Sequence, residues 1–249
     1  MTDHSSKLAA LRSGIDELDA ELVSLLSRRA KLTTQVGQIK AETGMPVYVP
    51  EREKELIASR RADAEAAGVS PDLTEDLLRR IMRESYHTQN NRYRCINPDI
   101  QQVVIVGGAG ALGKVIVSLF EKSGYPVAVV EKDDWSKPET EQLFARADLV
   151  IVAVPITLTE AVIRQLDALP EHCVLADITS IKVKPLTTML ACHKGPVVGL
   201  HPMFGPDAPG MIKQVVVVCD GRGEASYQWL IEQMRTWGAT VHHSTAEEH

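Results

Sequence analysis

The sequence predicts an all-helical N-terminal domain followed by an α/β domain with a parallel sheet. The first 90 or so residues carry almost only helical periodicity, and a polar stretch that contains Pro98 follows them. Beyond it, short β-branched runs alternate with helical segments, a pattern typical of parallel sheets covered by helices on both faces. The predicted parts are residues 1–92 (helical domain), 93–100 (linker) and 101–249 (α/β domain).

The composition is that of an ordinary soluble protein, with 44% hydrophobic and 24% charged residues. No run approaches the roughly 18 apolar residues of a membrane span, and the N-terminus lacks the layout of a secretory signal. Four scattered cysteines without a CxxC pair indicate a cytoplasmic protein without a metal site. Residues 1–94 hold 15 basic and 15 acidic side chains, so the remainder carries the whole net charge of −6. Neither part has the basic excess of a nucleic-acid-binding protein.

The first predicted helix, over residues 6–43, is on the order of 55 Å long and carries a heptad-like apolar stripe. It ends before Gly44 and Pro46, as helices commonly do. Position 29 on the stripe should be apolar, yet it is Arg29. The stripe consists of Leu8, Leu11, Ile15, Leu18, Leu22, Leu25, Leu32, Val36 and Ile39.

Two shorter helices should follow. The second begins at Pro50, a residue suited to a first turn, and fades near Gly68. The third has Ser70 as its N-cap, followed by Pro71. Because three helices, one of them very long, bury too little as a monomer, we expect a helical homodimer. The apolar face of the third helix comprises Leu73, Leu77, Leu78, Ile81 and Met82.

Further polar residues lie on these apolar faces. Lys40 follows Arg29 by 11 residues, about three turns plus 20°, so the two side chains point the same way. Arg12 precedes Arg29 by 17 residues and points about 260° away, so it suits a site in a partner chain. The remaining members of this set are Arg52 and Glu53 at the start of the second helix and Ser85 and Gln89 on the third.

These buried-face charges have two interpretations. Any single arginine on a helix is most often part of an internal or surface salt bridge, with Glu53 or Glu84 as candidate partners here. The cations nevertheless outnumber the acids on these faces, and burying unpaired cations is costly. A ligand with two carboxylates would supply the missing anions, because convergent arginines bind carboxylates through paired hydrogen bonds.

The order LR…RR…VGxxK…PVYVPERE…RESxxxQ resembles the all-helical chorismate mutase family across about 90 residues. In that family two chains intertwine and bind chorismate, a dicarboxylate, among the helices. The resemblance implies that Arg29, and Arg12 of the other chain, bind carboxylates, and that Lys40 and Gln89 bind the ether oxygen of the breaking bond. It also implies roles in carboxylate and hydroxyl binding for Arg52, Glu53 and Ser85. Val49 departs from the family, which often has an acid there.

These residue types suit the rearrangement of chorismate to prephenate. The reaction needs no nucleophile and no proton transfer. An enzyme accelerates it by holding a chair-like conformer and by directing donors at the negative charge that grows on the ether oxygen. Arg29 is therefore interpreted as a substrate clamp.

In the second domain, VVIVGGAGALGK places a GxGxxG motif, formed by Gly108, Gly110 and Gly113, between a strand and a helix. This is the context of a Rossmann-type dinucleotide-binding site, where the glycines allow close approach of a pyrophosphate. Glu131 ends the next strand, where an acid binds ribose hydroxyls and favours NAD over NADP. The neighbouring Lys132 reduces that preference. The alternative is a Rossmann-like sheet whose glycines only form a turn.

The segments GLHPMFGP and DITSIK each follow a predicted strand. They resemble the HPMFGP signature and the DxxSxK segment of prephenate and arogenate dehydrogenases. The resemblance implies that His201 takes the proton from the ring hydroxyl of prephenate while hydride leaves for NAD, and that Ser180 orients that hydroxyl. A base with a pKa near neutrality suits this oxidation, which releases CO₂ and gives 4-hydroxyphenylpyruvate.

The whole chain thus resembles the bifunctional chorismate mutase/prephenate dehydrogenase family of bacterial tyrosine biosynthesis. The resemblance also implies feedback inhibition by tyrosine, for which the sequence indicates no site. In that family a C-terminal helical domain follows, supplies an arginine to the prephenate site and forms a dimer. This sequence ends at STAEEH, so we expect an incomplete dehydrogenase half. The alternatives are a helical dimerisation module fused to a non-catalytic NAD-binding domain, and a dehydrogenase for another small acid.

Overall fold

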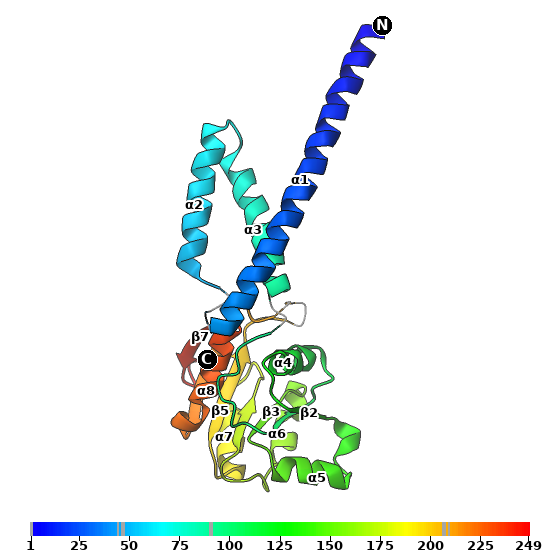
Figure 1. Cartoon of the computed structure of the whole chain (residues 1–249). Helices are drawn as coiled ribbons and strands as arrows, with labels where there is room; N and C mark the ends of the chain where they lie inside the picture. Colours follow the sequence, from blue (N-terminus) through cyan, green and yellow to red (C-terminus); the bar gives the residue numbers. More distant parts are fainter. Residues whose placement is uncertain (1, 44, 46–47, 90–91, 206–207, 209) are drawn as a thin grey trace.

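The computed structural model describes residues 2–43, 45, 48–89, 92–205, 208 and 210–249, and it contains the two predicted domains (Figure 1). The helical domain consists of α1 (Thr2–Thr43), α2 (Pro50–Ala66) and α3 (Pro71–Gln89). These bounds lie within a few residues of the three predicted helices. The helix α1, drawn in blue, extends far beyond the hairpin that α2 and α3 form (Figure 1).

Local signals account for the α2–α3 hairpin. Gly68 adopts a left-handed conformation with φ 72° just after α2, as glycine commonly does beyond a helix end. The Ser70 hydroxyl then accepts a hydrogen bond from the Leu73 N–H at 3.3 Å, which is the predicted N-cap. Arg61 of α2 forms ion pairs with Asp72 and Glu75, at 2.8 and 2.7 Å, and so ties α2 to α3.

The apolar stripe of α1 lies largely in the open. Leu11 is 68% exposed and Leu18 is 65% exposed, and the other stripe residues are exposed in the same range. On α3, Met82 is buried but Leu73 and Leu77 are exposed. A single copy therefore leaves a contiguous apolar surface uncovered, which is unusual for a monomer. In the part of the chain that the structure describes, no helix has both the length and the apolar character needed to cross a membrane.

The second domain is a seven-stranded sheet in the order β2-β1-β3-β4-β5-β6-β7. Strands β1 to β5 are parallel, β6 is antiparallel to β5, and β7 is parallel to β6. The strands are β1 (Val103–Val106), β2 (Val127–Val130), β3 (Leu149–Val152), β4 (Val174–Asp177), β5 (Val197–Pro202), β6 (Val215–Arg222) and β7 (Thr240–Ser244). The helices are α4 (Ala111–Lys122), the 3-10 turn η1 (Lys132–Asp134), α5 (Pro138–Ala145), α6 (Ile156–Ile163), α7 (Val183–Cys192) and α8 (Glu224–Thr236).

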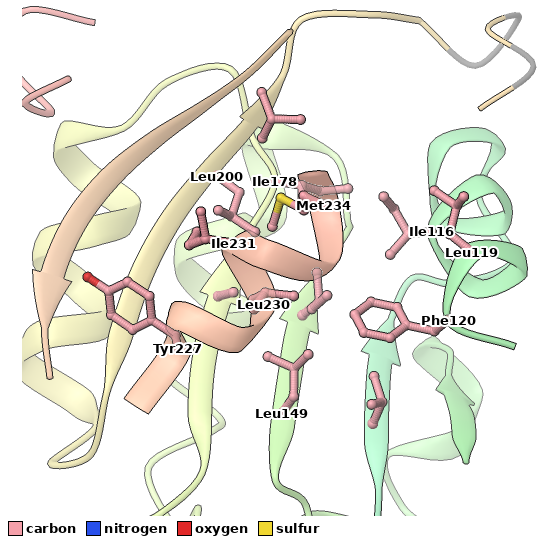
Figure 2. Close-up of a cluster of buried hydrophobic side chains, with 14 of the residues drawn as sticks. Ile116, Leu119, Phe120, Leu149, Ile178, Leu200, Tyr227, Leu230, Ile231 and Met234 are labelled. Atoms are coloured by element: carbon pink, nitrogen blue, oxygen red, sulfur yellow. The ribbon is translucent and has the colours of Figure 1, made fainter. Parts of the chain in front are cut away.

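Helices cover both faces of the sheet, as predicted. Successive residues of a strand point to opposite faces, so Val103 and Ile105 join one buried cluster and Val104 and Val106 join the other. Figure 2 shows the first cluster, in which α4 and α8 pack side chains such as Phe120 onto the strands. The second cluster packs under α5, α6 and α7.

Two features of the sheet differ from the prediction of a parallel sheet alone. The run 215–218 belongs to β6, which pairs antiparallel to β5, and no crossover helix lies among the described residues between these two strands. The strand β7 was not predicted, because TVHHS lacks the longer β-branched run of the other strands. Both strands extend the sheet on the side of β5.

Candidate functional site

The predicted mutase residues Arg29 and Ser85 are brought together. Arg29 of α1 donates a hydrogen bond from Nη1 to Ser85 Oγ of α3, over 2.5 Å. Ser85 is buried and its hydroxyl donates to the carbonyl oxygen of Ile81 at 2.8 Å. The hydrogen-bond partner of Arg29 is thus a neutral hydroxyl, and no acid among the described residues forms an ion pair with its guanidinium.

Glu53 lies in a cluster close to this pair. It is buried at the start of α2 and accepts a hydrogen bond from the Tyr86 hydroxyl at 2.9 Å. Lys213 of the second domain donates to Glu53 Oε1 at 2.5 Å, and Arg79 lies 3.5 Å from the same oxygen. Burial, followed by the hydrogen bond to Glu53, raises the pKa of Tyr86, so its hydroxyl stays protonated at neutral pH. The positive charge of Arg29 acts against this shift, which places Arg29 within electrostatic range of the cluster.

The other predicted mutase residues differ in their surroundings. Lys40 is half-buried on α1, and burial lowers the pKa of its ammonium group. Arg12 and Arg52 are exposed, and Arg12 lies about 25 Å from Arg29 along the helix, given the usual rise per residue. Gln89 is the last residue of α3, and its side chain lies outside the described part of the structure. One copy therefore assembles Arg29, Ser85 and Glu53, but not Arg12.

The glycine motif forms a tight cradle between β1 and α4. Gly110 is the N-cap residue of α4. A Cβ on Gly113 would lie 2.4 Å from the carbonyl oxygen of Gly107, and one on Gly108 would lie 2.8 Å from a methyl group of Val129. Only glycine fits these two positions, so the backbone N–H groups and the N-terminus of α4 stay open to a phosphate.

Glu131 closes one side of this cradle. It follows Val130, which pairs with Val106 in the sheet, and so it lies beside the loop that follows β1. Its Oε1 accepts a hydrogen bond from the Ala109 N–H at 2.7 Å. Between β1 and β3 the strand order changes direction, and this switch point is where open α/β sheets bind ligands. The residues present fit a dinucleotide with an adenosine ribose at Glu131.

His201 lies in β5 at the same edge of the sheet. Asp177, the last residue of β4, pairs with Gly199 of β5. His201 lies two residues further along β5 and therefore extends beyond the end of β4. The ring is partly buried, and its Nδ1 lies 2.6 Å from Nε2 of His249. Burial, with smaller contributions from the charges of His249 and Lys182, lowers the pKa of His201, so the ring is neutral at neutral pH and can accept a proton.

A buried ion pair supports the strand that carries His201. Lys182 donates to Asp177 Oδ2 at 2.6 Å and to the carbonyl oxygen of Leu200 at 2.7 Å, and both charged side chains are inaccessible to solvent. Thr179 donates to the same carboxylate through its hydroxyl and its N–H. Because Leu200 directly precedes His201, this ion pair fixes the backbone at His201. Burial lowers the pKa of Lys182 and raises that of Asp177.

Ser180 lies three residues beyond β4 and is exposed at this edge. Asp177 and Lys182 lie in the same DITSIK segment as Ser180, but they were not among the predicted site residues. Their signal was an acid that ends a strand and a lysine five residues later. Lys213 had no such signal, because its partner Glu53 is 160 residues away in the sequence.

Together, the arrangement offers two distinct chemistries. The helical domain presents cations and hydroxyls suited to a carboxylate-bearing ligand. The sheet edge joins a dinucleotide cradle to a neutral histidine, as a hydride-transfer site requires.

Two protein-family models match the chain, one for each domain. The model of chorismate mutase type II matches residues 11–90, a range that contains every predicted mutase residue. The model of the prephenate dehydrogenase nucleotide-binding domain matches residues 130–225, which include Glu131, Ser180 and His201. The helical domain is thus similar to the type II chorismate mutases, and the second domain is similar to the nucleotide-binding domain of prephenate dehydrogenases.

Two T-proteins match the chain along nearly all of its length. It is 51% identical to the T-protein of Enterobacter agglomerans over 245 residues, which cover 98% of this chain and 65% of that protein. It is 49% identical to the T-protein of Haemophilus influenzae over 244 residues, or 97% of this chain and 64% of that protein. The chain therefore spans slightly less than two thirds of the length of these relatives.

The fold of the second domain is also that of a solved prephenate dehydrogenase. The structure from A. aeolicus, in complex with hydroxyphenyl propionate and NAD+, has a TM-score of 0.51 over 61% of this chain and 62% of that chain. The sequence identity is 17%, so this likeness concerns the fold.

Proposed function

We propose that the helical domain converts chorismate to prephenate, and that the second domain binds NAD and supplies the general base for oxidation of prephenate, in tyrosine biosynthesis. The observation that carries the first part is the pairing of Arg29 with a hydroxyl beside the Glu53 cluster, within a range that matches the chorismate mutase model. The match to T-proteins along 98% of the chain supports the combination of both activities.

In the mutase half, Arg29 binds a carboxylate of chorismate and Ser85 orients the guanidinium. Lys40 and Gln89 donate hydrogen bonds to the ether oxygen as its bond breaks, and Arg52 assists at a carboxylate. Glu53 accepts the ring hydroxyl. Donors aimed at the growing charge lower the barrier without any proton transfer.

In the dehydrogenase half, the backbone at Gly108, Gly110 and Gly113 holds the pyrophosphate of NAD and Glu131 holds the adenosine ribose. NAD, when bound, accepts a hydride from the substrate. His201 takes the proton from the ring hydroxyl of prephenate, and its lowered pKa keeps it ready to do so. Ser180 orients that hydroxyl from the end of β4.

The mutase site requires a second copy of the chain. The exposed stripe of α1 supports this proposal, because covering each half-exposed leucine contributes on the order of 1 kcal/mol to association. Arg12, far along α1 from Arg29, would serve the site of the partner copy. The four cysteines, which are free thiols, fit a cytoplasmic enzyme. Feedback inhibition by tyrosine stays a prediction from the resemblance alone.

The loss of chorismate absorbance on adding the protein without a cofactor tests the mutase half. Turnover supports the proposal, whereas an inert sample would favour a helical dimerisation module fused to an NAD-binding domain. Binding of NAD to the same sample, measured by calorimetry, tests the second half independently.

Sedimentation of a chain with Leu18→Lys and Leu25→Lys tests the dimer. The charged stripe should give a monomer that has lost mutase turnover but still binds NAD. The control, Val23→Lys, places a single lysine on an exposed residue of α1 that lies off the stripe. A double variant that remains dimeric would contradict the proposed interface.

A further inference from the structure

One lysine of the nucleotide-binding domain reaches into the helical domain. Lys213 lies between β5 and β6, two residues before the start of β6. Its ammonium donates to Glu53 Oε1 at 2.5 Å. The Glu53 side chain is only 7% exposed and that of Lys213 is 35% exposed, so the pair is partly shielded from water.

The Lys213 side chain is held on several sides. Its ammonium lies 5.0 Å from the ring centroid of Tyr48 and 5.4 Å from that of Tyr86, within the range of cation–π attraction. Tyr86 binds the other oxygen of Glu53. The two tyrosines, the lysine and the carboxylate thus form one packed unit that spans both domains.

The backbone at Lys213 is also unusual. Its φ of 61° is the single positive value at a non-glycine position among the described residues. A left-handed conformation costs energy for a residue with a Cβ, and it persists where the surroundings enforce it. The N–H of Lys213 donates to the carbonyl oxygen of Gly238 at 3.1 Å, which anchors this backbone to the loop before β7. The backbone of Lys213 is therefore held in an unfavourable left-handed conformation, in which its side chain reaches Glu53.

The charge of Glu53 explains why a cation is needed there. The proposed substrate is a dianion, and a buried carboxylate beside its site would repel it. Arg79 lies 3.5 Å from Glu53 and its side chain is 49% exposed, so water screens its charge more. Lys213 is closer and better shielded, and it is thus the main neutralising partner.

We propose that Lys213 is a positioning residue for the mutase reaction, supplied by the dehydrogenase domain. It neutralises and orients Glu53, so that the carboxylate accepts the ring hydroxyl of chorismate without repelling the substrate carboxylates. This inference rests on the proposed mutase function. Lys213 follows His201 in the sequence and precedes β6. The proposed mutase site would therefore depend on a residue of the dehydrogenase half.

Steady-state consumption of chorismate by Lys213→Met and Lys213→Arg variants tests this role. We expect the methionine variant to raise KM roughly tenfold, because a charge partner of a buried carboxylate is lost, while kcat changes little. The arginine variant should restore most of the affinity. Lys194→Met, at an exposed lysine before β5, makes the same change in net charge and should leave KM unaltered.

A Lys213→Gly variant separates positioning from folding. Glycine relieves the left-handed backbone, so this variant should be as stable as the wild type in thermal unfolding and should still raise KM. In a Glu53→Gln background, which has no carboxylate to neutralise, Lys213→Met should have little further effect on KM. If Lys213 had only a structural role, Lys213→Met would lower the thermal stability of the wild-type chain and of the Glu53→Gln variant equally.

The outcomes distinguish this inference from the function on which it rests. If the wild-type chain does not consume chorismate, the proposed mutase function and the proposed role of Lys213 are both wrong. If the wild type is active and Lys213→Met leaves KM unchanged, the proposed role of Lys213 is wrong while the mutase function stands. The same holds if Lys213→Met raises KM equally with and without the Glu53 carboxylate.

Discussion

The two domains differ in how completely one copy of the chain buries its apolar residues. In the nucleotide-binding domain, strand residues such as Val104, Leu149 and Val216 are fully buried between two layers of helices. In the helical domain, the stripe on α1 stays about half exposed. The nucleotide-binding domain can therefore fold on its own core, whereas the helical domain leaves apolar surface that the proposed dimer would cover.

The same difference extends to the two sites. The dinucleotide cradle, Glu131 and His201 all come from strand ends of one sheet, so a single copy assembles them. The predicted mutase residues lie on separate helices, and Arg12 lies too far from Arg29 to join it within one copy. A site built on a sheet edge is set by register, whereas a site built between long helices is set by how those helices pack.

The largest effect that separates the two sites is expected for Lys40→Ala. Loss of a donor to the ether oxygen should lower kcat for chorismate by about 10²–10³, as removal of one oxyanion donor does in other enzymes. NAD affinity should stay the same, because α1 contributes nothing to the cradle. The kinetics of chorismate loss and a calorimetric titration with NAD measure the two effects.

Lys31→Ala is the matched control, since Lys31 is an exposed lysine on the same helix. It should keep full turnover. If Lys40→Ala turned over as fast as this control, Lys40 would have no role at the ether oxygen.

The converse change is Gly113→Ala in the second domain. The added Cβ would lie 2.4 Å from a backbone oxygen that cannot move freely, and such overpacking costs about 1–3 kcal/mol. NAD binding should weaken about tenfold to a hundredfold, with unchanged mutase turnover. Gly14→Ala is the control, because a Cβ there meets nothing within 4 Å. Equal NAD affinity in both variants would mean that the glycines only form a turn.

The sequence predicted what depends on local pattern. The β-branched runs gave β1 and β2 at their observed bounds, and the three-and-four spacing of leucines gave α1. It also placed Gly113 and His201 at the edge where the strands end. These features follow from side-chain periodicity and from the turn that glycine permits, and both are readable over a few residues.

The rest depended on contacts between distant segments. Nothing near Lys213 indicates that it would meet Glu53, because that contact depends on how the two domains pack. The reversal of direction at β6 was hidden because an antiparallel buried strand and a parallel one share the same apolar run. The pairing of Lys182 with Leu200 O was likewise invisible, since a backbone carbonyl has no sequence signature.

A smaller effect should appear in the pH dependence of the mutase. Lys40 must be protonated to donate to the ether oxygen, and burial lowers its pKa. As pH rises through that lowered pKa, the donor is lost, so kcat/KM for chorismate should decline at a pH below the ordinary range of lysine. A Lys40→Gln variant, whose amide does not titrate, should show low activity without this alkaline limb. An unchanged limb in that variant would assign it to another group.

The smallest effect tests the pair that one copy already assembles. Ser85→Ala removes the hydroxyl that Arg29 binds at 2.5 Å and that also bonds the Ile81 carbonyl. Losing one such hydrogen bond typically costs about 0.5–1.5 kcal/mol, so KM for chorismate should rise severalfold while kcat stays close to that of the wild type. Ser85→Thr keeps the hydroxyl and should retain most of the affinity. If alanine and threonine raised KM equally, the packing of α1 against α3, and not the orientation of Arg29, would be the role of this residue.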